Sequence, residues 1–174
     1  YRVTGDEDYS TKEELESSNF DKVNATVPGN CELELSKAGI LPSDLFFAQN
    51  IKKVDEYQMH EWYYVRDFFA NEEQKTKRCE LYFHGVDCFA DYYLNGEKIG
   101  HSENALIAHA FDVTGKLKDK NTLIVHIIST MLESHKYTSP VYSLAYANNC
   151  RIEFQTIRKP AHSFGWDIMP RCMT

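Results

Sequence analysis

The sequence predicts an all-β fold, an antiparallel jelly-roll β-sandwich with a short N-terminal helix. Segments rich in Tyr, Phe, Val and Ile are short, and polar turns separate them where a βαβ protein would have helices. The chain holds 11 Tyr and 10 Phe residues, which favour pleated surfaces. The dipeptide Asn95-Gly96 supplies the two positive-φ positions of a tight hairpin turn.

The strand-like signal starts after residue 60, and one short helix is predicted before it. Residues 6–19 are polar and charged, so we expect a surface loop with about one helical turn. The run 31–38 places Leu33 and Leu35 near one side, and Gly39 follows it directly. This pattern is typical of a short helix that ends at a glycine.

The strand pattern begins at Trp62. The segment 62–69 is dense in aromatic and β-forming residues, the polar run 71–77 ends it, and 78–84 forms the next predicted strand.

A hairpin and a central strand are predicted further on. Residues 88–94 and 97–99 flank Asn95-Gly96 and form the hairpin. The almost wholly apolar run 123–128 is typical of a strand in the middle of a sandwich. We expect 131–149 to form a long loop with at most one helical turn.

Composition excludes several classes of function. The chain has 26 Asp and Glu against 19 Lys and Arg, a formal net charge of −7, which argues against nucleic acid as a partner. No stretch approaches the ~20 apolar residues of a membrane helix, and none reads as a signal peptide. P-loop, dinucleotide and Gly-x-Ser-x-Gly patterns are absent, so we expect no cofactor.

The cysteines and histidines do not indicate a metal site. The five cysteines are odd in number and lack zinc-ligand spacing, so we expect free thiols packed as small apolar residues. The seven histidines form no His-Glu-x-x-His pattern, and the prediction is therefore no metal. Asn24-Ala25-Thr26 is a glycosylation sequon, a triplet that often arises by chance.

Two segments match patterns of one large enzyme family. The first is Val27-Pro28-Gly29, followed by a Leu-rich stretch and then Trp62-Tyr63-Tyr64. The second runs from Phe83-His84-Gly85 through Leu94-Asn95-Gly96-Glu97 to Phe111-Asp112-Val113-Thr114. The second segment resembles the galactose-binding-domain-like jelly roll found throughout family 2 glycoside hydrolases.

A third segment narrows the resemblance to the β-mannosidase branch. Arg158-Lys159, then Phe164-Gly165-Trp166-Asp167 and Pro170-Arg171, is similar to the Arg-Lys…Phe-Gly-Trp-Asp-Trp-Gly-Pro-Arg motif of that branch. Ile168-Met169 stands where the family has Trp-Gly. The resemblance implies that residues 22–174 are the N-terminal sandwich domain, truncated at its C-terminal end, and that 1–21 is an extension on or before it.

The resemblance also implies which residues would touch substrate. In proteins of this family the Trp-Asp pair, here Trp166 and Asp167, reaches toward the active site of a (β/α)8 barrel and holds the sugar. A carboxylate can accept two strong hydrogen bonds from adjacent hydroxyls, and an indole offers a flat apolar face. Core packing for the Trp and a turn for the Asp would be the simpler explanation of the tripeptide taken alone.

Supporting roles are expected for Arg158, Lys159 and Arg171. The first two would orient the carboxylate of Asp167 or serve the structure only, and Arg171 would pair with Asp167 or with the barrel. No catalytic residue is assigned to this chain, because a retaining glycosidase needs two carboxyl groups about 5 Å apart and the family keeps both in the barrel. We expect the chain alone to be inactive and its parent to hydrolyse terminal β-mannosides or related glycosides.

Two other functions remain open. The domain could be an independent carbohydrate-binding module, for which Tyr137, Tyr142 and Tyr146 are the candidate surface aromatics. It could also be a purely structural interaction domain, with Ile168-Met169 marking loss of the sugar contact. The expected partners are a carbohydrate and the catalytic barrel, not nucleic acid or membrane. The compartment is unassigned, and the resemblance alone implies a secreted, periplasmic or lysosomal protein.

Overall fold

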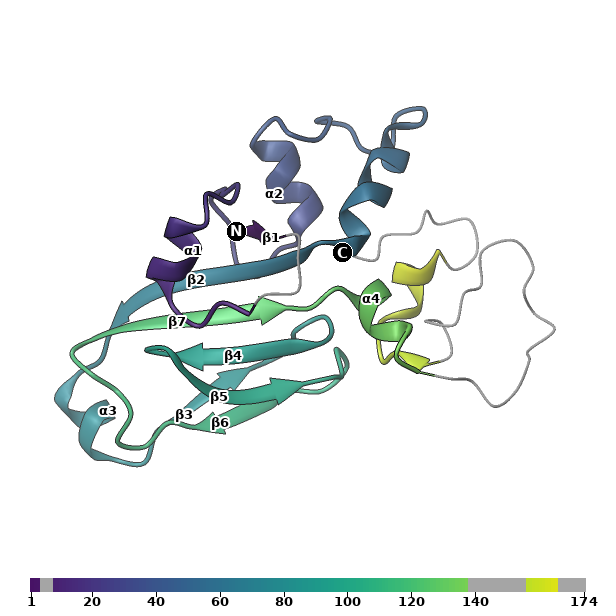
Figure 1. Cartoon of the computed structure of the whole chain (residues 1–174). Helices are drawn as coiled ribbons and strands as arrows, with labels where there is room; N and C mark the ends of the chain where they lie inside the picture. The colour runs from purple at the N-terminus through teal and green to yellow at the C-terminus, as the bar shows by residue number, and fades with distance from the viewer. Residues whose placement is uncertain (4–7, 138–155, 166–174) are drawn as a thin grey trace.

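The strands form two antiparallel sheets (Figure 1). The computed structural model describes residues 1–3, 8–137 and 156–165. The larger sheet has five strands in the order β1-β2-β7-β4-β5, and the smaller pairs β3 with β6. The strands are β1 (Arg2–Val3), β2 (Glu61–Phe69), β3 (Glu80–Phe83), β4 (Ala90–Leu94), β5 (Glu97–Ser102), β6 (His109–Asp112) and β7 (Lys120–Ile127).

The described helices are short. They are α1 (Lys12–Ser17), α2 (Cys31–Lys37), α3 (Glu72–Thr76), α4 (Thr130–Ser134) and the 3₁₀ helices η1 (Asn50–Met59) and η2 (Ala161–Phe164). The predicted helix is therefore present as α2, and Gly39 follows it with a φ of 75°, a conformation that favours glycine. None of the described helices has the length and apolar character needed to cross a membrane.

One local expectation was wrong, and two of the described helices were not predicted. Leu33 is 51% exposed, because Cys31 and Leu35, one turn apart, form the buried side of α2. The polar run 71–77 contains α3, which the side chain of Asn71 caps by accepting from the Gln74 N–H. A polar helix of this kind has no apolar periodicity to reveal it. The 3₁₀ helix η1 was not predicted either, although Ile51, Val54 and Tyr57 recur every three residues and pack in one cluster.

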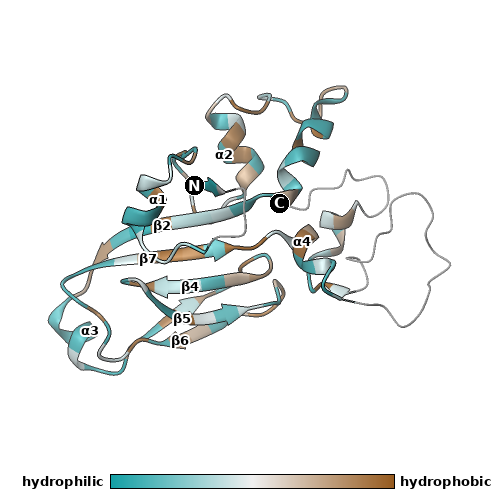
Figure 2. Cartoon of the chain, in the orientation of Figure 1, coloured by the Kyte–Doolittle hydropathy of each residue, from teal (hydrophilic) through white to brown (hydrophobic). Residues whose placement is uncertain are grey.

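The predicted hairpin and central strand are confirmed. Asn95 and Gly96 have φ values of 53° and 86°, as a type I′ turn requires, and they join β4 to β5. The strand expected over 123–128 is β7, which lies between β2 and β4. Figure 2 shows strongly hydrophobic positions along β7, in agreement with its central place.

The core lies on both faces of the larger sheet. On one face, Phe83 and Phe111 of the small sheet pack against Tyr92 of β4, each with ring centroids 4.6 Å from that tyrosine. Trp62, on the same face of β2, packs with residues of α2 and η1. On the opposite face, Leu15 of α1 packs in a buried cluster with Tyr63, Tyr93 and Ile124.

Thiols and surface charge agree with the composition. Cys31, Cys79 and Cys88, the cysteines within the described residues, are free, and two of them are buried.

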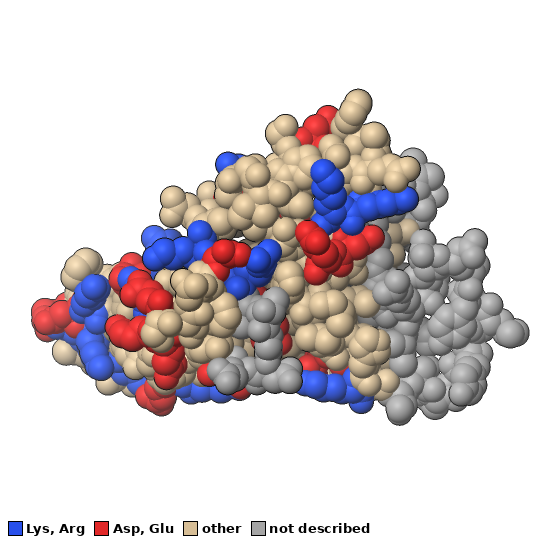
Figure 3. Space-filling model, turned by 45° about the horizontal axis from the view of Figure 1, so that its top comes forward, with Lys and Arg blue, Asp and Glu red and all other residues tan. Residues whose placement is uncertain are grey.

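On the face shown in Figure 3, Lys and Arg side chains are interspersed with Asp and Glu. A mixed surface of this kind favours solubility and offers no continuous basic track on that face.

Candidate functional site

The segment 156–165 carries the predicted site residues that the structure describes. Ile157 and Phe164 are buried in a cluster with Cys88, Phe89 and Met131. Both flanks of the segment are therefore fixed by apolar packing against the residues just before β4 and against α4. The segment ends with η2, after which Gly165 adopts a left-handed conformation with a φ of 77°.

Arg158 is held by its backbone. Its carbonyl oxygen accepts a hydrogen bond of 2.9 Å from the Ala105 N–H, and Asn104 and Arg158 form an isolated parallel bridge. The loop that receives it is ordered in turn, because the Leu106 N–H bonds Asn104 Oδ1 at 2.9 Å. The side chain of Arg158 is exposed. Its contribution to the structure thus comes from the main chain.

Lys159 points into the protein. Its side chain is fully buried, and Nζ lies 2.9 Å from Asp87 Oδ2. Neither Nζ nor the second oxygen, Asp87 Oδ1, has a hydrogen-bond partner among the described residues. The Asp87 side chain is 40% exposed and stands at the boundary between the interior and solvent.

Other titratable groups surround the buried ammonium. Burial raises the pKa of Glu32, at the start of α2, while Lys159 opposes and Asp87 adds to that effect. Burial also raises the pKa of the Cys31 and Cys88 thiols to about 12 each. Both thiols are therefore neutral at pH 7, and neither is an activated nucleophile.

The structure separates the two supporting residues that are adjacent in sequence. Arg158 faces solvent, whereas Lys159 forms a buried ion pair. Trp166, Asp167 and Arg171 lie outside the described residues, as do Tyr142 and Tyr146 of the candidate aromatic series. Tyr137 packs its ring against Phe89, with centroids 6.5 Å apart, so it serves local packing.

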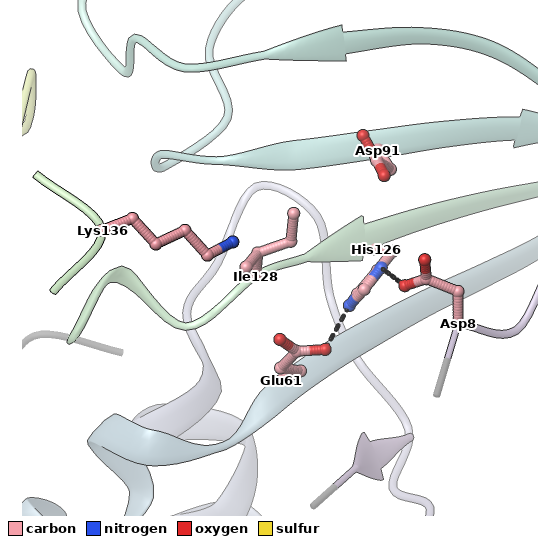
Figure 4. A pocket seen from close by; sticks show the side chains of 6 residues that line it. All are labelled: Asp8, Glu61, Asp91, His126, Ile128 and Lys136. Carbon is pink, nitrogen blue, oxygen red and sulfur yellow. Dashed lines mark hydrogen bonds and ion pairs between the residues drawn. The ribbon is translucent and has the colours of Figure 1, made fainter. Parts of the chain in front are cut away.

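A polar pocket lies on the sheet face that also carries α1 (Figure 4). Its volume is about 330 Å³, and its lining residues are Asp8, Glu61, Asp91, His126, Ile128 and Lys136. His126 Nε2 lies 2.7 Å from Glu61 Oε2, and Nδ1 lies 3.7 Å from Asp8 Oδ1. Carboxylates and an imidazole in this arrangement can hydrogen-bond a hydroxylated ligand, but the described residues that line the pocket include no Trp, Tyr or Phe ring as a stacking platform.

Asp91 is the pocket carboxylate with the most partners. Its oxygens lie 2.6 Å from Lys98 Nζ and 2.5 Å from His101 Nδ1. Burial acts to raise the pKa of Asp91, but these two bonds outweigh it and hold the pKa below its usual value. Asp91 is therefore ionised near pH 7 and does not donate a proton there. Both of its oxygens already bind protein groups, so its role is structural.

Sequence reasoning missed most of these residues. One signal was available, since His126 interrupts an otherwise apolar central strand. Asp87 and Glu32 carried no signal, because they meet Lys159 only through the fold. Within the part of the chain that the structure describes, no group of three His, Cys, Asp or Glu side chains could hold a metal ion.

Comparisons with known proteins agree on one enzyme family. A family model described as glycosyl hydrolase 2 galactose-binding domain-like matches residues 9–174. Beta-mannosidase B of Thermothelomyces thermophilus is 30% identical over 150 residues, covering 84% of this chain and 17% of that protein. Beta-mannosidase of Mus musculus is 30% identical over 159 residues, with the same two coverages.

A solved structure gives the same result. The Beta-D-mannosidase from Dictyoglomus thermophilum superposes with a TM-score of 0.75 at 32% identity. The match covers 86% of this chain and 18% of that one. The chain thus spans less than a fifth of the length of each of these relatives.

Proposed function

The chain belongs to the glycosyl hydrolase 2 galactose-binding domain-like family, and we propose that it is the non-catalytic N-terminal domain of a larger, β-mannosidase-like exo-glycosidase. The family expected from three sequence segments is thereby confirmed. Relatives named as beta-mannosidases support terminal β-mannosides, or related glycosides, as the substrates of the whole protein.

The observation that carries the proposal is the anchoring of segment 156–165. The chain is fixed up to Gly165 by the main-chain hydrogen bond of Arg158, by the buried side chain of Lys159 and by the packing of Ile157 and Phe164. The next residues are Trp166 and Asp167, the pair proposed to contact the sugar. A contact loop performs best when a rigid support holds its base, which is what this segment offers.

The proposal includes an architecture. We propose that residues 22–174 form a jelly-roll sandwich, that 1–21 extends onto it, and that the domain packs on an absent (β/α)8 barrel. The barrel would hold the two carboxyl groups of a retaining mechanism, so the chain alone would not hydrolyse glycosides. Arg171 would pair with Asp167 or with the barrel, and Arg158 remains a proposed supporting residue.

The deciding experiment compares the full-length protein with its Asp167→Ala variant on an aryl β-mannoside. We expect the variant to lose roughly 10- to 100-fold in kcat/KM, because hydrogen bonds to a charged acceptor are among the strong ones. Asp119→Ala, at an exposed site near α3, is the matched control and should be unchanged. Wild-type activity with an unaffected Asp167→Ala variant would leave the domain as a scaffold only.

A second candidate function rests on the polar pocket. The cavity around His126 could bind a hydroxylated ligand without any barrel, as an independent carbohydrate-binding module does. Calorimetric titration of the chain with mannose and with manno-oligosaccharides tests it directly. Binding lost in Glu61→Gln would favour this module. Absence of binding, with mannosidase activity in the full-length protein, would favour the accessory domain.

A further inference from the structure

His126 is buried in the central strand with one ring nitrogen unused. The residue is 1% exposed, and its Nδ1 has no hydrogen-bond partner among the described residues. Asp8 Oδ1 lies 3.7 Å from Nδ1, which is too long for a hydrogen bond. Buried polar atoms without a partner are rare in folded proteins, and each one points to a water, an ion or a functional role.

The other ring nitrogen determines which form of the imidazole faces the pocket. Nε2 of His126 lies 2.7 Å from Glu61 Oε2, and an ionised carboxylate only accepts, so Nε2 carries the proton. In the neutral ring this leaves a bare lone pair on Nδ1. His126 therefore presents a hydrogen-bond acceptor to the cavity, beside the carboxylate of Asp8 (Figure 4).

The carboxylates of the pocket are not all neutralised by cations of the protein. Asp91 is paired with Lys98 at 2.6 Å. The ion pairs that Asp8 and Glu61 form within the described part of the chain are with His126, and none is with a Lys or Arg. Two of the three carboxylates in the lining therefore leave negative charge for a ligand to balance.

Lys136, the lysine in the lining, is already occupied. Its Nζ lies 2.5 Å from Glu133 Oε2, and its side chain is 69% exposed. The other polar side chains of the lining offer acceptors to the cavity. A ligand that matches this set must bring hydrogen-bond donors and positive charge, and a primary ammonium group brings three N–H donors and no acceptor.

The spacing of the acceptors suits a single nitrogen atom. Because His126 Nδ1 and Asp8 Oδ1 are 3.7 Å apart, one ammonium nitrogen can lie within about 3 Å of both. The cavity of about 330 Å³ is at the lower end of the range of small-molecule sites, roughly 300–1,000 Å³. A metal ion is a poorer match, since no group of three His, Cys, Asp or Glu among the described residues could hold one.

We propose that this pocket is a binding site for a small primary ammonium compound, which donates hydrogen bonds to His126 Nδ1 and to the carboxylate of Asp8. Glu61 holds the proton on Nε2 and so keeps Nδ1 available as the acceptor. The site is formed by residues of this chain and does not depend on the accessory role proposed above. It differs from the hydroxyl-binding alternative in the charge that the ligand must carry.

Calorimetric titration of the full-length protein with three related compounds tests the proposal. Ethanolamine has an ammonium with N–H donors, ethylene glycol is its uncharged counterpart, and choline has the charge without the donors. We expect ethanolamine to bind about 10-fold or more tightly than the other two, because hydrogen bonds between charged groups are among the strong ones.

Three results of this titration would overturn the proposal. Failure of ethanolamine to bind removes the site. Equal binding of ethylene glycol shows that the pocket recognises hydroxyl groups, as the carbohydrate-binding alternative requires. Equal binding of choline shows that negative charge attracts cations there without hydrogen bonds to a particular nitrogen.

Asp8→Asn locates the binding in this pocket. Asp8 is 72% exposed, so the variant should keep the melting temperature of the wild type, and we expect its affinity for ethanolamine to fall about 10-fold. Glu13→Gln is the matched control, because it removes the same charge from an exposed position in the nearby helix α1. An unchanged affinity in Asp8→Asn, or an equal loss in Glu13→Gln, contradicts the proposed site.

His126→Phe tests the ring nitrogen itself. This variant keeps a flat ring against Tyr63 and removes Nδ1, so ethanolamine binding should be lost. Thermal unfolding shows whether the variant is folded, and if it is not, Asp8→Asn decides. Binding that persists in folded His126→Phe overturns the role of Nδ1. None of these results bears on Asp167, so the accessory role stands or fails by its own experiment.

Discussion

The imidazole ring of His126 lies flat against the phenol ring of Tyr63, with centroids 4.0 Å apart and planes 10° from parallel. The two residues are direct cross-strand neighbours in β7 and β2. Glu61, two residues before Tyr63, lies 2.7 Å from His126 Nε2. A polar ring is thus accommodated in the central strand by one stacked aromatic neighbour and one carboxylate.

Replacing His126 is predicted to destabilise the sheet. His126→Ala removes a fully buried ring, leaves a cavity beside Tyr63 and deprives Glu61 of its partner. We expect the free energy of unfolding to fall by about 2–4 kcal/mol. Urea denaturation of the 174-residue chain measures it. His84→Ala, at an exposed position, is the control and should match the wild type.

Asp91 is predicted to make stability depend on acid pH. Its pKa in the folded state lies below its usual value, so its contribution is complete above the unfolded pKa, near 3.9, and is lost as pH falls through the lower folded value. We expect Asp91→Asn to be less stable than wild type at pH 6, by about 1–3 kcal/mol.

The difference between the two proteins should shrink steadily below about pH 4. Unfolding free energies of both proteins, measured between pH 2.5 and 6 by denaturant titration, give this curve. A gap that is the same at every pH would show that the ion pairs of Asp91 with Lys98 and His101 contribute nothing through charge.

Gly100 is predicted to tolerate no side chain. A Cβ at this position of β5 would lie 2.1 Å from the ring of Phe111, which itself packs on Tyr92. We expect Gly100→Ala to cost about 1–3 kcal/mol, because the new Cβ overlaps a ring that must give up its contact with Tyr92 to make room. Gly85→Ala is the control, since its Cβ would meet Ala105 O at an ordinary 3.5 Å. Thermal unfolding of the two variants distinguishes them.

Local chemistry made much of the β structure predictable. Asn95-Gly96 supplies the two positive-φ positions of its turn, and Gly39 ends α2 through the same conformational freedom. The central strand β7 could be predicted because a strand that is buried on both faces has a run of apolar residues. In contrast, α3 is stabilised by its cap and buries no side chain, so hydrophobic periodicity does not record it.

Only part of the candidate site could be predicted from the sequence, for a related reason. A motif identified Lys159 as a supporting residue, but nothing in the sequence connects it to Asp87, 72 positions earlier. The pocket around His126 is likewise assembled from four separate segments of the chain. Pairings of this kind are products of topology, and a single sequence contains no local pattern that marks them.

Asn95 is predicted to stabilise the fold in two separable ways. Its side-chain oxygen accepts from the Thr122 N–H at 3.0 Å, and its amide donates to the buried Asn121 Oδ1 at 3.0 Å. Asn95→Gly keeps the turn conformation and loses both bonds, which we expect to cost about 1–3 kcal/mol. Asn95→Ala loses the same bonds and, unlike the glycine variant, keeps a Cβ at a φ of 53°, which costs about 1–2 kcal/mol relative to glycine.

Alanine should therefore be the worse replacement at position 95, although it is the better β-former of the two. Urea denaturation of both variants gives the order, with Asn24→Ala in an exposed loop as the control. If the glycine variant were the less stable protein, chain entropy would outweigh the strain at positive φ.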